Sequence, residues 1–212
     1  MAPKLYIKTP SPPARAVLVT AAAIGLELDL VHVEKDFLHS DEYLQLNPQG
    51  TIPTLVDNEV VICDSHVIST YLIEKYGKDD LLYPRDLEKR VVIDQRLYYD
   101  TGVIFPLILK IGNKLFTKTF KDESKELQES AFKVYDILEK YLEKTEWLAG
   151  DYTTLADISC SMTIKSMNLA IPFDIEKHKK LTTWLEKVNT LSYLSVDEPY
   201  FREFKQIYES VL

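Results

Sequence analysis

Cysteine is scarce in this chain of 212 residues, and its two examples, Cys63 and Cys160, lie far apart among apolar neighbours. Neither belongs to a Cys-x-x-Cys pair or to a cysteine and histidine spacing that holds zinc, so the sequence predicts no metal site. We expect two buried, reduced thiols, and a disulfide between them is the less favoured alternative.

Long apolar runs and an excess of positive charge are also missing. The run at 16–26 is too short to cross a bilayer and has no layout of a cleavable leader, which favours a cytoplasmic protein without a membrane partner. With 33 acidic and 25 basic residues the formal net charge is −8. This argues against nucleic acid as a partner, because phosphate binding needs clustered Lys and Arg.

The first third of the chain changes its hydrophobic period repeatedly, which predicts short strands alternating with helices. We expect strands at 5–7, 28–33, 54–56 and 60–62, the last two forming a hairpin, and helices at 11–23, 41–46 and 64–76. Gly25 and Gly77 would end two of these helices. The order β-α-β-α-β-β-α, with a right-handed crossover between the first two strands, predicts a thioredoxin-like domain.

The rest of the chain shows no convincing strand pattern. Apolar residues at helical spacing predict helices at 87–116, 124–142, 154–167 and 181–191. The fold class is therefore α+β, with an N-terminal domain at 1–79, a linker at 80–86 and an all-helical domain at 87–212. Thr154 and Asp157 form a capping box, which we interpret as purely structural.

The segment Ser11-Pro12-Pro13-Ala14 stands where a redox member of this fold class carries two cysteines. Disulfide exchange needs a thiolate, so that chemistry is excluded at this site. Pro12 disfavours helical backbone at Ser11, which therefore suits the N-cap of the helix. Ser11 would either cap the helix and do nothing more, or donate a hydrogen bond to the thiolate of a ligand.

One hydrogen bond from a serine hydroxyl is strong enough to stabilise the thiolate of a ligand. A thiol with a pKa of about 8.5 is only about 3% ionised at pH 7, and lowering that pKa by two units takes roughly 2.7 kcal/mol. A hydrogen bond to a charged acceptor contributes about 1.5–3 kcal/mol, and the helix dipole adds some tenths.

Two further segments suit a peptide ligand. Pro53, directly before a strand, is either an ordinary turn residue or a cis proline that exposes the backbone of Ile52 for pairing with a peptide. Asp64 or Ser65 would cap a helix, or Ser65 would hold a carboxylate and Asp64 an ammonium, as an amino-acid head group requires. We interpret His66 as a surface or satisfied histidine rather than a catalyst.

In order and at matching spacing, these motifs resemble the insect epsilon class and, less closely, the delta class of glutathione transferases. The resemblance is carried by SPPARAVL at 11–18, NPQGTIPTL at 47–55, DSHVISTYL at 64–72, YGKDDLLYP at 76–84, IDQR at 93–96 and TLADIS at 154–159. It implies a homodimeric enzyme of detoxification or related metabolism, with glutathione as co-substrate and no metal. Such an enzyme conjugates the glutathione thiolate to small hydrophobic electrophiles.

The resemblance also implies roles for individual residues. Ser11 would activate the thiol, a task that a tyrosine near the place of Tyr6 fills in other classes of the superfamily. The implied glutathione-binding residues are His39, Gln49, Gly50, Thr51, Ile52, Pro53, Asp64, Ser65 and His66. The implied hydrophobic-substrate residues are Pro13, Phe105, Ile108, Leu109, Gly112, Phe204 and Tyr208, although these could equally be core residues.

Two positions depart from the family pattern, because Gly50 and Leu38 stand where histidines are usual. The histidine at the first position contacts the glycine carboxylate of glutathione in the family. Losing one such contact costs about 1–3 kcal/mol, so glutathione would bind weakly unless His39 or Lys35 substitutes. The departures favour the alternative function, a transferase-fold protein that sequesters apolar ligands with weak or no turnover.

Overall fold

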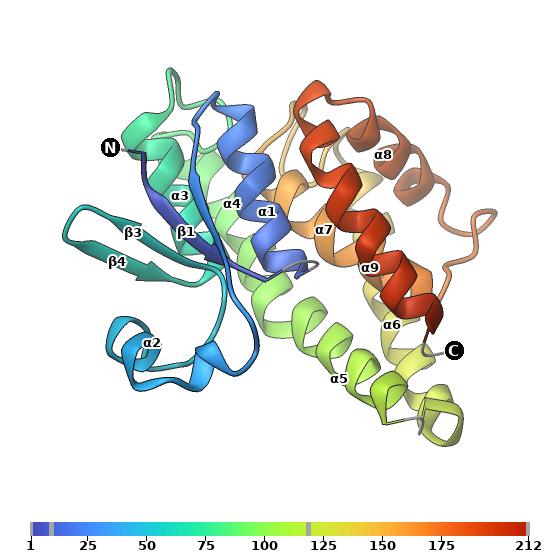
Figure 1. The fold of residues 1–212 in the computed structure, drawn as a ribbon. Coiled ribbons are helices and arrows are strands. Elements are labelled where there is room, and N and C mark those ends of the chain that lie inside the picture. The colour runs from blue at the N-terminus through green and yellow to red at the C-terminus, as the bar shows by residue number, and fades with distance from the viewer. Residues whose placement is uncertain (1, 9–10, 118–119, 211–212) are drawn as a thin grey trace.

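The structure, a computed structural model, describes residues 2–8, 11–117 and 120–210 and has the two parts that the sequence predicts (Figure 1). The N-terminal part contains β1 (Lys4–Ile7), α1 (Pro12–Ala23), β2 (Asp29–His32), a 3₁₀ turn (Phe37–His39), α2 (Asp41–Leu46), β3 (Thr54–Asp57), β4 (Val60–Cys63) and α3 (Ser65–Tyr76). The C-terminal part contains α4 (Leu87–Tyr99), a π-helical segment (Asp100–Ile104), α5 (Phe105–Phe116), α6 (Phe120–Leu142), α7 (Leu155–Ala170), α8 (Lys179–Asn189), a 3₁₀ segment (Ser192–Asp197) and α9 (Glu198–Ser210).

The sheet confirms the thioredoxin-like arrangement. Its strand order is β2-β1-β3-β4, with β1 parallel to β2 and antiparallel to β3, and with β3 and β4 joined as a hairpin. Leu5 and Ile7 of β1 are fully buried, as expected for alternate residues of a strand that has one face covered.

Helix α1 belongs to two hydrophobic cores at once. Val17 and Ala21 pack with the sheet and α3, whereas Ala16 and Val19 pack with the helices of the C-terminal part. A helix that is apolar on nearly all sides must be buried on all sides. Because α1 lies between the two parts, its first residue, next to Ser11, lies at the boundary where both parts contribute side chains (Figure 1).

A buried carboxylate fastens α3 to the sheet. Oδ2 of Asp57 accepts hydrogen bonds from Tyr71 Oη at 2.8 Å, Lys75 Nζ at 2.7 Å and Tyr76 Oη at 2.6 Å. Burial raises the pKa of Asp57, but these three donors outweigh burial and hold its pKa below the usual value. The C-terminal half of α3 is therefore bonded to the sheet.

The structure corrects three details of the sequence analysis. The helix expected at 87–116 is interrupted by the π-helical segment, which ends two residues before Pro106. Proline has no backbone N–H, so Pro106 cannot donate the hydrogen bond that a regular helical turn needs. Helix α9 was not predicted. Cys160 is buried, but Cys63 is only partly buried, and both thiols are free.

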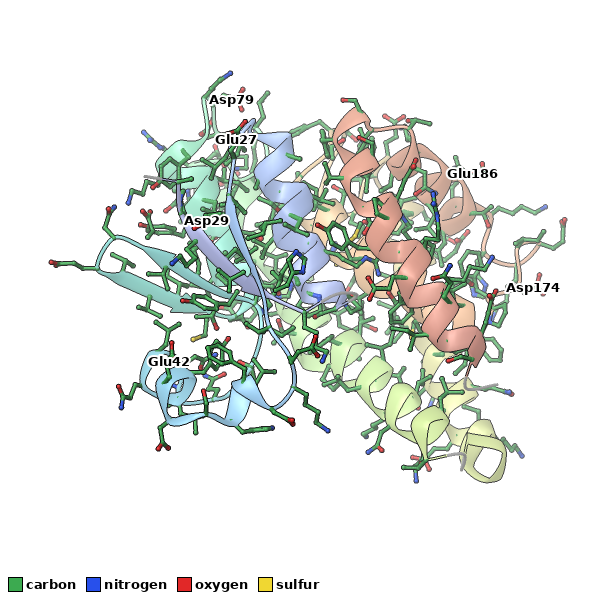
Figure 2. All side chains as sticks on the ribbon, viewed as in Figure 1. Glu27, Asp29, Glu42, Asp79, Asp174 and Glu186 are labelled. Atoms are coloured by element: carbon green, nitrogen blue, oxygen red, sulfur yellow. The ribbon has the colours of Figure 1, made fainter. Side chains whose placement is uncertain are left out.

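The connection between α3 and α4 contains no helix or strand, while the domain boundaries at 79 and 87 stay predictions. The labelled carboxylates in Figure 2, among them Glu42, Asp79 and Asp174, point outward from both parts, so the acidic excess includes separated surface groups. Within the described ranges, none of the helices is long and apolar enough to cross a membrane.

Candidate functional site

A cavity of about 430 Å³ lies where α1 begins, between the two parts of the chain. It is lined by Ser11, Pro12, Pro13, Ala16, Leu38, Gln49, Thr51, Ile52, Pro53, Asp64, Ser65, His66, Asp100, Thr101, Phe105, Leu109, Ser159 and Thr163. The structure thus brings together Ser11 and the loop 49–53 with the start of α3, as the sequence predicts. His39 and Gly50 are not among the lining residues.

Ser11 occupies the N-cap of α1 with non-helical backbone, φ −53° and ψ 121°. Its side chain accepts no capping hydrogen bond, and prolines fill the next two positions, so only a later N–H is left for it to cap. Within the described ranges the hydroxyl is therefore left without a structural partner at the positive end of the helix. A cap-only role for Ser11 does not fit this geometry.

The loop before β3 is held rigidly beside Ser11. The peptide bond between Ile52 and Pro53 is cis, which is one of the two alternatives that the sequence left open. The carbonyl oxygen of Thr51 accepts hydrogen bonds from Tyr43 Oη at 2.6 Å and Asn47 Nδ2 at 2.9 Å, and both donor residues are buried. These two hydrogen bonds hold the Thr51 carbonyl in place, so Thr51 and Ile52 line the cavity in a fixed backbone conformation.

At the start of α3 the carboxylate of Asp64 performs the capping. Its Oδ1 accepts the N–H groups of His66 at 2.9 Å and Val67 at 3.2 Å. His66 is a satisfied histidine, as expected: Nε2 lies 3.1 Å from Asp100 Oδ2 and Nδ1 lies 2.6 Å from Thr101 Oγ1. These two bonds join the start of α3 to the helical part.

Asp100, Thr101, Ser159 and Thr163 line the cavity but were not expected there. Asp100 Oδ1 and Ser159 Oγ are buried and have no hydrogen-bond partner among the described residues. Both residues line the cavity, but these two atoms are themselves buried, and a buried polar atom without a partner costs about 1–3 kcal/mol. No local signal identifies these residues, because each lies in a helix and the fold alone brings them to the cavity.

A second, apolar pocket of about 310 Å³ adjoins the first and shares Pro12, Phe105 and Leu109 with it. It contains all the expected hydrophobic-substrate residues except Pro13, which lines the first cavity. The described lining has no charged side chain and consists of Pro12, Phe105, Ile108, Leu109, Ile111, Gly112, Asn113, Leu115, Ser166, Ala170, Phe204, Ile207 and Tyr208. This wall suits an uncharged apolar molecule.

Gly50 has a left-handed backbone, φ +61°, and its surroundings are close. A Cβ at this position would lie 3.0 Å from the carbonyl oxygen of Leu38 and 3.8 Å from Nδ1 of His39. The imidazole of His39 therefore approaches the space that a side chain at position 50 would occupy.

We expect Gly50→Ala to lower the free energy of unfolding by about 1–3 kcal/mol, because it combines a strained φ with a close backbone contact. It should also weaken glutathione binding by moving the neighbouring Thr51. Thermal unfolding and calorimetric titration measure the two effects. Gly25→Ala is the matched control, since Gly25 has φ +70° but nothing within 4 Å of its Cβ position. An unchanged glutathione affinity in Gly50→Ala would contradict the placement of this loop in the site.

Comparison with known proteins agrees with this geometry. The family model described as the glutathione S-transferase N-terminal domain matches residues 5–80, and the C-terminal domain model matches residues 100–191. Glutathione S-transferase 1 of Manduca sexta is 40% identical over 195 residues, covering 88% of each chain.

Solved structures show the same likeness over nearly the full length. An epsilon-class glutathione S-transferase from the housefly Musca domestica has a TM-score of 0.90 and 36% identity, covering 99% of this chain and 98% of its own. A glutathione transferase homologue from Drosophila mojavensis, solved with bound glutathione, has a TM-score of 0.88 and 35% identity, covering 99% of this chain and 97% of its own. With both domain models and these full-length relatives in agreement, the chain belongs to the glutathione S-transferase family, whose members are enzymes that conjugate glutathione.

Proposed function

We propose that the hydroxyl of Ser11 donates a hydrogen bond to the sulfur of bound glutathione and holds it as a thiolate. The observation that carries this proposal is the hydroxyl without a capping bond at the N-terminus of α1, in a cavity that Thr51, Ile52 and the cis Pro53 also line. The thiolate attacks an electrophilic carbon, a sulfur–carbon bond forms, and a leaving group departs or a double bond takes up the electron pair. Proximity and stabilisation of the anion supply the rate.

The γ-glutamyl end of glutathione fits the start of α3. The hydroxyl and backbone N–H of Ser65 suit the α-carboxylate, because the N–H groups of His66 and Val67 are already bonded to Asp64 Oδ1. The Asp64 carboxylate suits the ammonium group. The cis-proline loop supplies Ile52 for the cysteinyl backbone, while Gln49, Gly50 and His39 lie toward the glycine end.

The apolar pocket would hold the electrophile. Because it shares Pro12, Phe105 and Leu109 with the cavity at Ser11, a molecule seated there has its reactive carbon near the thiolate. Leu109 is 57% exposed, so it offers apolar surface to a ligand rather than to the core. The uncharged lining favours neutral apolar electrophiles.

Titration calorimetry with glutathione, followed by a conjugation assay with a neutral aromatic electrophile, tests the assignment. We expect micromolar binding and steady turnover. No binding at millimolar glutathione, together with tight uptake of an apolar dye, would instead support a sequestering protein.

We also propose a homodimer in the cytoplasm. Side chains on neighbouring helices support it: Val67 on α3 is 53% exposed, and Val91 and Tyr98 on α4 are 55% and 77% exposed. Helices α3 and α4 are adjacent, because Glu74 and Arg90 form an ion pair at 3.1 Å between them. An exposed apolar surface of this kind is typical of a subunit interface.

We expect Tyr98→Glu to shift the sedimentation coefficient from dimer toward monomer, because an unpaired charge in the interface is not solvated. Ile175→Glu is the matched control, since Ile175 is 61% exposed on the loop before α8. Equal sedimentation of both variants and the wild type would exclude this surface as the interface.

A further inference from the structure

Arg15 is an arginine buried almost completely, at 1% exposure, one turn after Ser11 on α1. Buried charges persist only when they are paired, and its partner is Asp197, also 1% exposed. The pair is bidentate, with Nε 2.5 Å from Oδ1 and Nη2 3.0 Å from Oδ2. Lys165 of α7 adds a bond to Asp197 Oδ2 at 3.1 Å. These side chains join the N-terminal part to α7 and to the start of α9.

The same arginine contacts α9 itself. Asp197 directly precedes α9, and the Phe201 ring lies 4.8 Å from the guanidinium carbon of Arg15. Nζ of Lys165 lies 5.0 Å from the same ring. We call Arg15, Lys165, Asp197 and Phe201 the Arg15 anchor. No residue of α9 is fully buried, so this helix is held by the anchor together with the packing of Tyr200 and Tyr208 against the two cores.

Helix α9 forms the outer wall of the apolar pocket. It contributes Phe204, Ile207 and Tyr208 to the lining. Arg15 also reaches the inner wall, because its Nη1 donates to Ser166 Oγ at 3.0 Å and Ser166 lines the pocket from α7. One guanidinium group thus contacts both Ser166 of the inner wall and the start of α9, the helix of the outer wall.

We propose that Arg15 is a positioning residue that holds α9 over the apolar pocket and thereby sets how well the enzyme uses long apolar electrophiles. The proposal rests on the assigned role of this pocket as the electrophile site. A short electrophile reacts beside Ser11 without touching α9, whereas the tail of a long one is buried against it. Loosening the anchor therefore weakens binding of the long substrate and leaves the short one unaffected.

Replacing Arg15 itself would leave the buried Asp197 carboxylate with Lys165 as its remaining cation and could unfold the protein. The test therefore uses Phe201→Ala in the full chain. Phe201 belongs to the anchor but not to the described lining of the pocket, and the substitution removes no charge. Gln206→Ala, at an exposed position of α9, is the matched control. The probes are two neutral halonitrobenzenes with the same reactive carbon, one without and one with a long alkyl chain.

We expect Phe201→Ala to raise KM for the long-chain probe about threefold to tenfold, because its cation–π contacts with Arg15 and Lys165 are lost, with kcat changed less than twofold. Both constants for the short probe should stay at the wild-type values, and hydrogen exchange of the α9 amides should accelerate. Equal changes for both probes, or no change in exchange and KM, would overturn the proposal. Ile108→Trp tests the proposed function separately, because the larger side chain fills the apolar pocket. If KM for the long-chain probe then stays unchanged, the pocket is not the electrophile site.

Discussion

Ser11→Ala should reduce kcat/KM for conjugation by about a hundredfold to a thousandfold at neutral pH, the cost of removing one donor to a reactive anion. The thiol of bound glutathione would return toward its ordinary pKa of about 8.5, so the rate of the variant should rise with pH up to that value. Glutathione affinity should change little, since the hydroxyl contacts only the sulfur. Kinetics across pH and ultraviolet absorption of the bound thiolate measure both effects.

Tyr6→Phe is the matched control for Ser11→Ala. Tyr6 is the nearest sequence alternative as thiol-activating residue, yet its ring packs against Tyr43 with centroids 5.7 Å apart, and it is absent from the described cavity lining. We expect wild-type kinetics in Tyr6→Phe. If Ser11→Ala stays fully active while Tyr6→Phe loses activity, the thiol is activated from the strand rather than from the helix mouth.

Asp157→Ala should be the most destabilising of the substitutions considered, lowering the free energy of unfolding by about 3–5 kcal/mol. Asp157 is 0% exposed and accepts four hydrogen bonds. Thr154 donates its N–H at 2.8 Å and its hydroxyl at 3.0 Å to Oδ2, while Leu148 N and Trp184 Nε1 donate to Oδ1 at 2.9 Å each. Truncation leaves these donors buried without an acceptor. Each such donor costs about 1–3 kcal/mol of stability, and partial relaxation of the structure reduces the total.

Differential scanning calorimetry should show a fall in Tm of roughly 2–4 °C for each kcal/mol lost, as expected for a chain of this size. Asp86→Ala is the matched control, because Asp86 is an exposed N-cap of α4 that accepts a single bond from Lys89 N at 3.0 Å. That variant should lose only about 1 kcal/mol. Similar losses in the two variants would contradict a special role of the buried capping box. The fraction of Asp157→Ala that stays folded should keep its catalytic constants, because this residue does not line the cavity.

Local chemistry made much of the candidate site predictable. Pro12 forces Ser11 into an N-cap conformation, and the residues around Pro53 and Asp64 have backbone requirements that can be recognised in the sequence. Asp100 and Ser159 could not be found in this way. Each occupies a helix whose pattern gives no sign of a site. Both line the cavity, and Asp100 contacts His66, which lies on another part of the chain.

The strands and helices of the N-terminal part, the helical character of the C-terminal part and the family resemblance were all readable in the sequence, because hydrophobic period, prolines and capping residues act over only a few neighbours. Helix α9, the missing capping bond of Ser11, the approach of His39 to Gly50 and the pairing of Arg15 with Asp197 across 182 positions became visible in the folded chain alone. Such contacts depend on how buried surfaces pack, and packing joins residues whose separation along the chain carries no local signal.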